Sequence, residues 1–147
     1  MGQEIERKFL VDKSKWEAIE KPAGIEIRQG YLNKKPENTV RIRTKGSKGY
    51  ITVKGIEVKG VRPEFEYEIP FSDAFEMLEM FCDKVLHKTR YEISQDAHTW
   101  EVDVFHSPNN GLLLAEIELN AIDELFTRPD WIGDEVTGIP EYYNANM

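Results

Sequence analysis

Charged and apolar residues alternate in the first eleven positions of the chain, and this alternation limits the folds open to it. If the segment forms a β-strand, Glu4, Glu6 and Lys8 point to one side. Ile5 and Phe9 then point to the other side. The same period of two returns in most of the later strand-like segments. We therefore expect a sheet with one charged and one apolar face, whose function depends on which face turns inward.

Eight segments have the alternation and length of β-strands. They are 3–11, 25–33, 39–45, 50–55, 61–70, 85–94, 99–106 and 111–120. The connections between them are rich in Gly, Asn and Pro, which is typical of hairpin turns. Mainly antiparallel strands joined by hairpins favour a closed barrel, because closure removes exposed sheet edges. The expected fold is therefore α+β, mainly β: an eight-stranded antiparallel closed barrel forming a tunnel, with a few flanking helices.

Three short helices are expected to interrupt the strands. They are 13–20, 73–82 and about 121–127. Asp12 and Ser72 are the predicted N-caps of the first two. Phe75, Leu78 and Cys82 have the spacing of an apolar helical stripe. No repeat or linker divides the sequence, so a single domain over residues 1–147 is expected.

Composition excludes several classes of protein. A net charge of −8 argues against general affinity for nucleic acid or acidic lipid, although a local cationic site can still bind an anion. The single cysteine, Cys82, excludes an internal disulfide and a cysteine-based zinc cluster. The sequence has neither a long apolar run nor a signal-peptide core, so a cytoplasmic protein without membrane contact is expected. Its state is expected to be a monomer or a homodimer.

The charged residues of all these strands can be collected on one face. The cations are Lys8, Arg41, Arg43, Lys54, Arg62, Lys88 and Arg90, and the carboxylates are Glu4, Glu6, Glu64, Glu66, Glu68, Glu101, Asp103, Glu116 and Glu118. An antiparallel sheet usually turns such a face to solvent. Surface strands, however, mix Thr, Ser, Gln and Lys, whereas Glu and Arg dominate here. Like charges two positions apart, as in Arg41 and Arg43, repel each other, so a barrel that encloses bound ions explains them better.

The two signs of charge together indicate the ligand. Arginine binds phosphate groups with paired hydrogen bonds and lysine binds them as a point charge, so the cations suit several phosphates. The carboxylates would repel such a ligand unless they hold divalent metal ions. A ligand set of oxygens alone favours Mg²⁺ or Mn²⁺. The pattern therefore predicts a site for a metal ion and a polyphosphate.

The sequence resembles a known family at these positions. Glu4-Ile5-Glu6-Arg7-Lys8 resembles the ExExK signature of the CYTH superfamily, the triphosphate tunnel metalloenzymes. The later elements follow in the family's order: Arg41-Ile42-Arg43, Thr52-Val53-Lys54, Arg62 through Glu68, Lys88-Thr89-Arg90, Glu101-Val102-Asp103 and Glu116-Ile117-Glu118. Positions 28–32 and 133–137, with Tyr143-Asn144, are similar to the short bacterial members, which most resemble inorganic triphosphatases.

The resemblance implies a tunnel in which basic residues grip a triphosphate and acidic residues bind metal. We expect divalent-metal-dependent hydrolysis of inorganic triphosphate, a small-molecule substrate, with Mg²⁺ or Mn²⁺ as the cofactor. Glu4, Glu6 and Lys8 are the predicted catalytic residues. Lys8, Arg41, Arg43, Lys54, Arg62, Lys88 and Arg90 are the predicted substrate ligands, and Glu4, Glu6, Glu64, Glu66, Glu68, Asp103, Glu116 and Glu118 the predicted metal ligands.

As a hypothesis of mechanism, we divide the acids between two metals. One metal would lie near Glu6, Glu116 and Glu118, and a second near Glu4 and the glutamates of segment 61–70. A C-terminal plug of the tunnel would have to be short, since the sequence given ends at Met147. Three alternatives stay open: a class IV-type adenylate cyclase that makes cyclic AMP from ATP, a thiamine triphosphatase, and a module that binds polyphosphate or nucleotides without turnover.

Other conspicuous residues are expected to be structural. His87, His98 and His106 are not spaced as a metal set. Cys82 is interpreted as a packed thiol. The tryptophans Trp16, Trp100 and Trp131 are expected to pack against or cover the barrel.

Overall fold

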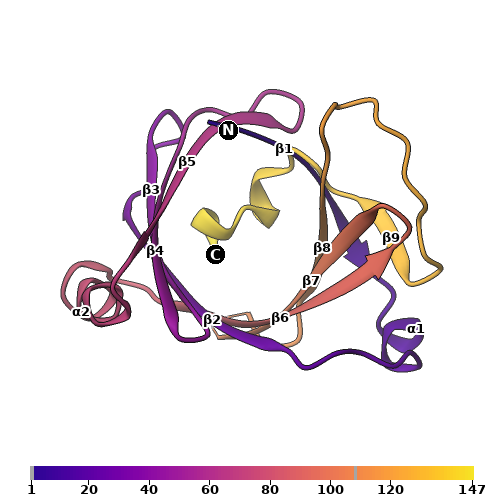
Figure 1. The fold of residues 1–147 in the computed structure, drawn as a ribbon, viewed down its shortest axis with the longest axis horizontal. Coiled ribbons are helices and arrows are strands. Elements are labelled where there is room, and N and C mark those ends of the chain that lie inside the picture. The colour runs from indigo at the N-terminus through magenta and orange to yellow at the C-terminus, as the bar shows by residue number, and fades with distance from the viewer. Residues whose placement is uncertain (1, 108) are drawn as a thin grey trace.

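The closed barrel is present in the computed structural model, which describes residues 2–107 and 109–147 (Figure 1). Its strands are β1 (Gln3–Val11), β2 (Ile25–Asn33), β3 (Thr39–Lys45), β4 (Lys48–Lys54), β5 (Val61–Ile69), β6 (Leu86–Gln95), β7 (His98–Ser107), β8 (Leu113–Glu118) and β9 (Ile132–Glu135). Neighbouring strands are antiparallel in the order β5-β4-β3-β2-β6-β7-β8-β1, and β1 returns to β5. The predicted fold is therefore confirmed, with β9 as an additional strand.

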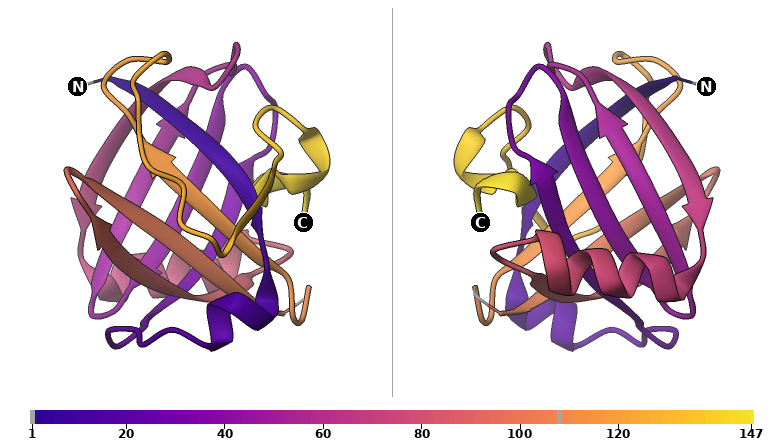
Figure 2. Two further views of the ribbon diagram at one scale, coloured as in Figure 1. Left: turned by 90° about the vertical axis from the view of Figure 1, so that its right-hand side faces the viewer. Right: turned by 90° about the vertical axis from the view of Figure 1, so that its left-hand side faces the viewer.

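β1 closes the barrel, and one of its edges is shared by two partners. Gln3, Glu4 and Ile5 pair with β5, whereas Phe9 and Val11 pair with β9. The sequence did not predict β9, because four residues with a glycine among them carry almost no alternation signal. The pairing of β9 directs the following residues, 136–147, across one end of the barrel, where they form the 3₁₀ turns η1 (Pro140–Tyr142) and η2 (Asn144–Asn146) (Figures 1 and 2).

The first two predicted helices are present with changed boundaries. α1 (Lys13–Glu17) follows Asp12, whose carboxylate accepts a hydrogen bond from the Lys15 backbone N–H at 3.1 Å, so this cap is confirmed. α2 (Phe71–Phe81) begins one residue before Ser72, so the prediction of Ser72 as its cap is wrong, and Pro70 takes the N-cap position. Proline is compatible with this boundary because its ring fixes φ at a value that suits the start of a helix. Its missing backbone N–H costs nothing there, since the first N–H groups of a helix have no partner within the helix.

The predicted stripe of α2 is partly wrong. Leu78 is buried as expected, but its partner in the core is Ala74, whereas Phe75 is exposed. α2 packs against the outer side of β3 and β4, where Ile42 completes this small cluster. Cys82 is half-buried beside it, in keeping with a packed thiol.

The helix predicted at about 121–127 is wrong. The chain makes one turn there, in which the Asn120 backbone N–H donates to the Glu124 carboxylate at 2.7 Å. It then runs in an extended path over the barrel wall, so that the ring of Phe126 meets those of Phe9 and Trp100 edge to face. Burial of Phe126 against this aromatic surface outweighs the weak helical tendency of so short a segment.

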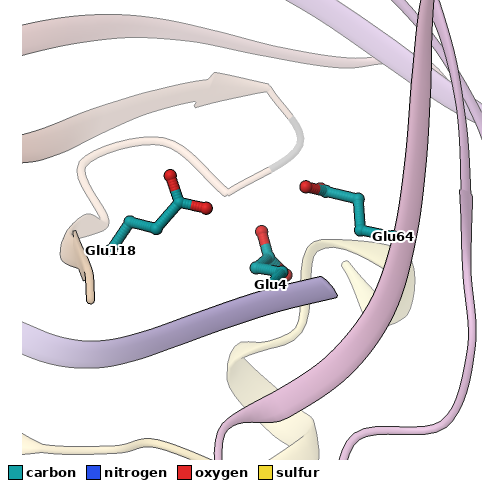
Figure 3. A group of neighbouring side chains, drawn as sticks. All are labelled: Glu4, Glu64 and Glu118. Atoms are coloured by element: carbon teal, nitrogen blue, oxygen red, sulfur yellow. The ribbon is translucent and has the colours of Figure 1, made fainter. Parts of the chain in front are cut away.

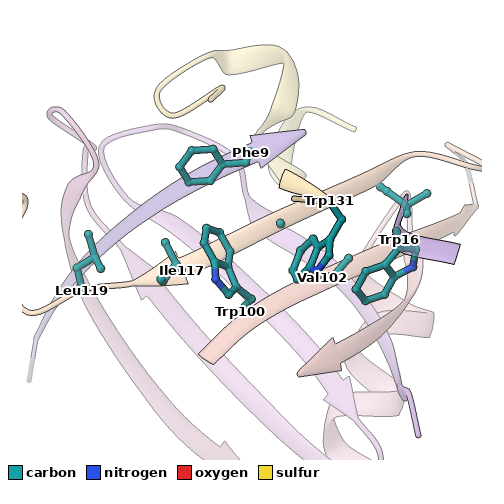
Figure 4. Close-up of a cluster of buried hydrophobic side chains, with 9 residues drawn as sticks. Phe9, Trp16, Trp100, Val102, Ile117, Leu119 and Trp131 are labelled. Atoms are coloured by element: carbon teal, nitrogen blue, oxygen red, sulfur yellow. The ribbon is translucent and has the colours of Figure 1, made fainter. Parts of the chain in front are cut away.

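The main apolar cluster lies outside the barrel, between its wall and the segments that cover it (Figure 4). Its buried members are Phe9, Trp16, Trp100, Val102, Leu113, Ala115, Ile117, Leu119 and Trp131. They come from the outer faces of β1, β7 and β8, from α1 and from the segment that leads to β9. The predicted packing of the three tryptophans is borne out by their burial here. With this face outward, the charged face of the same strands turns toward the lumen.

The inward-facing rows become apolar at one end of the barrel. Leu10 follows Lys8 on β1, Leu86 precedes Lys88 on β6, and Leu114 precedes Glu116 on β8, each by two positions. These side chains cluster with Phe105 and with Val136, Ile139, Tyr142 and Met147 of the C-terminal segment. The segment thus packs on an apolar layer at the end of the charged lumen.

Candidate functional site

The lumen of the barrel contains a cavity of about 370 Å³. The residues of the charged face that line it are Glu4, Glu6, Lys8, Arg41, Arg43, Lys54, Arg62, Glu64, Glu66, Lys88, Arg90, Glu101, Glu116 and Glu118. They come from seven strands, β1 and β3–β8, because each presents alternate residues to the inside. Side chains that are far apart in the sequence are therefore brought into one enclosed space.

Two predicted metal ligands do not line this cavity among the described residues. Glu68 is exposed near the end of β5, beyond the stretch of that strand that pairs with β1. Asp103 is 2% exposed, and its carboxylate receives Arg90 Nε at 2.8 Å, Arg90 Nη2 at 3.0 Å and Lys88 Nζ at 2.7 Å. Glu68 therefore lies outside the described lining of the cavity, and Asp103 is the partner of two cations.

The cations crowd together in the middle of the tunnel. Burial, with the charges of Arg41 and Arg90, lowers the pKa of Arg43 to about 9. Burial, with the charges of Arg90 and Arg43, lowers the pKa of Lys88 to about 7, although Asp103 opposes this shift. The Nε of Arg41 is buried and finds no hydrogen-bond partner within residues 2–107 and 109–147. This region therefore has a surplus of positive charge and a free donor, both of which an anion would satisfy.

Ion pairs with carboxylates hold the side chains of two further cations that line the cavity, Lys8 and Lys54. Lys8 Nζ lies 3.3 Å from Glu116 Oε2, and Lys54 Nζ lies 3.2 Å from Glu4 Oε1 and 3.4 Å from Glu64 Oε2. Burial acts to raise the pKa of Glu116, but the charges of Lys8 and Arg90 hold it at about 2. Glu116 is therefore a carboxylate that positions cations.

Three carboxylates converge next to the cations (Figure 3). Oxygens of Glu4 on β1, Glu64 on β5 and Glu118 at the end of β8 all lie within 4.8 Å of one another. Burial, followed by the charge of Glu4, raises the pKa of both Glu64 and Glu118. Burial and the charges of Glu116 and Glu4 also raise the pKa of Glu6. These acids thus lack sufficient positive charge, and their oxygen-only donor set fits a hard divalent cation.

The sequence did not predict two amides of the site. Gln29 is completely buried, and its Oε1 accepts hydrogen bonds from Arg43 Nε at 2.9 Å and Nη2 at 2.6 Å. Asn144 Oδ1 accepts hydrogen bonds from Lys88 Nζ at 2.7 Å and from Gln29 Nε2 at 3.0 Å. Gln29 could have been found from the alternation, because it follows Ile25 and Ile27 at the inward-facing positions of β2 and is polar where those two are apolar. Asn144 lies in a segment without periodicity.

The C-terminal segment therefore contacts the cationic part of the tunnel directly. Besides the Asn144 contacts, Lys8 Nζ donates to the Tyr142 carbonyl at 2.9 Å and Tyr143 OH donates to Glu57 at 3.1 Å. Burial and the Glu57 charge raise the pKa of Tyr143, which keeps this hydroxyl protonated as the donor. The segment borders the cavity at one end.

The fold and its lumen define a class, that of closed antiparallel barrels whose tunnel is lined by cationic and anionic side chains. This chain belongs to the CYTH domain family, whose model matches residues 2–143. It is 47% identical over 148 residues to the inorganic triphosphatase of Acetivibrio thermocellus, an alignment covering 100% of this chain and 94% of that protein.

Solved structures agree with the assignment. The inorganic triphosphatase NE1496 is 32% identical, with a TM-score of 0.62 and coverage of 97% of this chain and 94% of that chain. A putative adenylate cyclase from Bacillus halodurans, 21% identical with a TM-score of 0.57, covers 83% of this chain and 84% of its own and shares the fold. No helix of the described residues is long and apolar enough to span a bilayer.

Proposed function

We propose that this chain is an enzyme that hydrolyses inorganic triphosphate to pyrophosphate and orthophosphate in the tunnel, with the help of a divalent cation. The observation that carries the proposal is the meeting of two regions in one cavity. A crowded group of buried cations, whose charge Asp103 compensates only in part, adjoins three convergent carboxylates, whose charge Lys54 compensates only in part. A complex of a polyphosphate with a metal ion supplies both missing charges at once. The named activity of the Acetivibrio relative supports the same reaction.

The substrate would lie along the cations. Lys8, Arg41, Arg43, Lys54, Lys88 and Arg90 line the cavity and would neutralise the phosphate oxygens. Arg62 also lines it, with its Nε donating to the Gly55 carbonyl at 3.1 Å, which keeps this side chain at the wall. Asp103 and Gln29 hold three of the guanidinium and ammonium groups in place, so these groups need little reorganisation when the substrate binds.

Glu4, Glu64 and Glu118 would hold the metal ion, with Glu6 nearby, and Mg²⁺ and Mn²⁺ both match their oxygen donors. Once bound, the ion would supply charge neutralisation at the phosphate and a lower pKa for a water molecule. This grouping differs from the predicted division of acids, since Glu118 lies with Glu4 and Glu64, and Glu116 is held by Lys8 and Arg90. We therefore assign Glu116 to positioning.

The protein's own residues would do the rest of the work. The cations fix the chain of phosphates in one place, so attack by water on a terminal phosphorus is directed by position. They also stabilise the negative charge that develops on the leaving pyrophosphate. The barrel wall, with its apolar layer behind Lys8 and Lys88, limits the water that reaches the substrate.

An assay of products with matched variants tests the proposal. Phosphate release from triphosphate, thiamine triphosphate and ATP is measured with Mg²⁺ and with Mn²⁺, and cyclic AMP is measured with ATP. We expect release from triphosphate, a loss of about 100-fold or more in turnover for Lys88→Ala, and a similar loss for Glu64→Gln. Glu68→Gln, an acid of the same strand outside the cavity, is the control and should keep full activity.

Other outcomes would favour the alternatives. Cyclic AMP from ATP would identify a cyclase, faster release from thiamine triphosphate would identify that substrate, and binding of triphosphate without products would identify a binding module. Equal effects of the Glu64 and Glu68 substitutions would remove the metal site from the carboxylate cluster.

A further inference from the structure

A hydrogen-bonded group of two histidines, a carboxylate and a hydroxyl lies on the outer wall of the barrel. It consists of Glu26 on β2, His87 and Thr89 on β6, and His106 on β7. His87 and Thr89 alternate with Lys88 and Arg90 along β6, so they face away from the tunnel. The lining of the tunnel includes none of the four among the described residues, so the proposed hydrolysis leaves them without a role.

The two imidazoles converge on one carboxylate. His87 Nε2 lies 2.7 Å from Glu26 Oε1. Thr89 Oγ1 lies 2.9 Å from Glu26 Oε2 and 2.7 Å from His106 Nε2, so that His106 reaches the same carboxylate through the hydroxyl. The centroids of the two imidazole rings are 5.0 Å apart. The two nitrogen donors and the carboxylate thus come from three neighbouring strands, with the Thr89 hydroxyl lying between His106 and Glu26.

A β-bulge places His106 in this group. In the ladder between β6 and β7, His87 pairs with Ser107 and Lys88 pairs with Phe105, so His106 is the extra residue. Bulges re-aim a side chain and are frequent near functional sites. Here the bulge leaves Lys88 directed into the tunnel while it brings the two histidines side by side on the outside.

The hydrogen bonds fix where the protons are. Hydrogen bonds from His87 and Thr89 lower the pKa of Glu26, which is therefore an ionised acceptor. Thr89 must then donate its single hydroxyl proton to Glu26, and His106 must donate to Thr89. Both Nε2 atoms consequently carry hydrogen in the metal-free protein. A metal ion would take the place of these hydrogens at the same nitrogen atoms.

We propose that Glu26, His87 and His106 form a binding site for a transition-metal ion such as Zn²⁺, outside the tunnel. Two imidazole nitrogens and a carboxylate, with water in the fourth position, match the ligands and coordination number of Zn²⁺, and Ni²⁺ and Cu²⁺ accept the same donors. Mg²⁺ and Mn²⁺ prefer the oxygen-only cluster in the tunnel. Thr89 keeps its hydrogen bond to Glu26 and orients the carboxylate from behind.

Binding has a cost that limits the affinity. His106 must turn from the Thr89 hydroxyl to the metal ion, and two hydrogen bonds are exchanged for coordination bonds. Arg28, the register partner of His87 on β2, is exposed and places a positive charge beside the site. His87 is partly open to solvent, so an ion can enter without unfolding of the wall.

Calorimetric titration of Zn²⁺ into the untagged full chain, in excess Mg²⁺ to fill the tunnel cluster, tests this site. We expect one Zn²⁺ per chain, with affinity reduced at least about 10-fold in both His87→Ala and His106→Ala. His98→Ala is the control, because it removes the third histidine of the chain, which pairs with Glu124 and not with Glu26. This variant should bind Zn²⁺ as tightly as the unchanged protein does.

Two further measurements keep the test decisive. Circular dichroism of each variant checks that the barrel is folded, and Zn²⁺ should raise the melting temperature of the unchanged protein and of His98→Ala but not of the other two variants. Affinity should fall as the pH is lowered, because protons compete for the imidazoles. An absence of Zn²⁺ binding in Mg²⁺, or equal weakening in all three variants, would overturn the site, and either result leaves the proposed hydrolysis untouched.

Discussion

Arg90 and Asp103 face each other across β6 and β7, and the guanidinium binds the carboxylate through Nε at 2.8 Å and Nη2 at 3.0 Å. Both side chains are buried, and Lys88 Nζ joins the same carboxylate at 2.7 Å. Burial acts to raise the pKa of Asp103, but the two cations hold it well below its ordinary value. Asp103 is therefore a buried negative charge that keeps two cations of the tunnel in position.

Replacement of Asp103 is expected to damage stability and activity together. Asp103→Asn removes the nearest counter-charge of two buried cations, and breaking a buried ion pair in this way typically costs about 3–5 kcal/mol. Urea unfolding should show this loss in the free energy of unfolding. Asp134→Asn, on the exposed side of β9, is the control and should stay within about 0.5 kcal/mol. A loss for Asp103→Asn as small as that of the control would contradict the role of this ion triad.

The lowered pKa of Lys88 predicts a dependence of stability on pH. Its folded value of about 7 lies below the ordinary value of 10.5, so between these pH values the unfolded chain binds more protons at this residue. The contribution of Lys88 to the free energy of unfolding therefore rises with pH over that window. Urea unfolding at pH 7 and pH 9.5 should give a smaller rise for Lys88→Met than for the unchanged protein. Parallel pH profiles for the two would refute this assignment.

The sequence predicted the fold and most of the tunnel for one physical reason. Alternation is a property of each strand by itself, and antiparallel closure converts eight such strands into a lumen, so residues such as Glu6 and Arg43 could be placed without knowledge of contacts. Glu68 obeys the same alternation, but it lies near the end of β5, where it pairs with Tyr50 of β4 and is exposed outside the cavity lining. Alternation does not report how far along a strand the cavity extends.

The missed features depend on contacts between distant segments. Asn144 reaches Lys88 because β9 pairs with β1 and directs the C-terminal segment over the barrel. Neither β9 nor that segment has a periodic pattern. The proximity of His87 and His106 was not predicted, because spacing in the sequence does not show that β2, β6 and β7 are neighbours or that His106 lies in a bulge. Such features follow from strand order, which a single sequence does not give.

The placement of the core outside the barrel has a direct consequence for mutations. Trp100 is completely buried among Phe9, Phe126 and Trp131, so Trp100→Ala should lower the free energy of unfolding by about 3–5 kcal/mol. Leu125→Ala is the matched control, since Leu125 is 91% exposed in the same covering segment. It should change stability by less than about 0.5 kcal/mol. Equal effects in urea unfolding would place the core elsewhere.

The carboxylate cluster should destabilise the metal-free protein. The pKa of Glu64 is raised, first by burial and then by Glu4, so its ionisation is less favourable in the folded chain than in the unfolded chain. The stabilising contribution of Glu64 to the folded state is therefore fully present below its ordinary pKa of 4.5. This contribution is lost as the pH rises through the raised pKa of the folded protein. At pH 7 without divalent cations, Glu64→Gln should consequently be more stable than the unchanged protein. With Mg²⁺ or Mn²⁺ the order should reverse, because the ion stabilises only a cluster that binds it. Melting temperatures of both proteins, with chelator and with each metal, measure this reversal, and Glu68→Gln should shift in parallel with the unchanged protein. A Glu64→Gln protein that gains as much from the metal as the unchanged one would show that the ion binds outside this cluster.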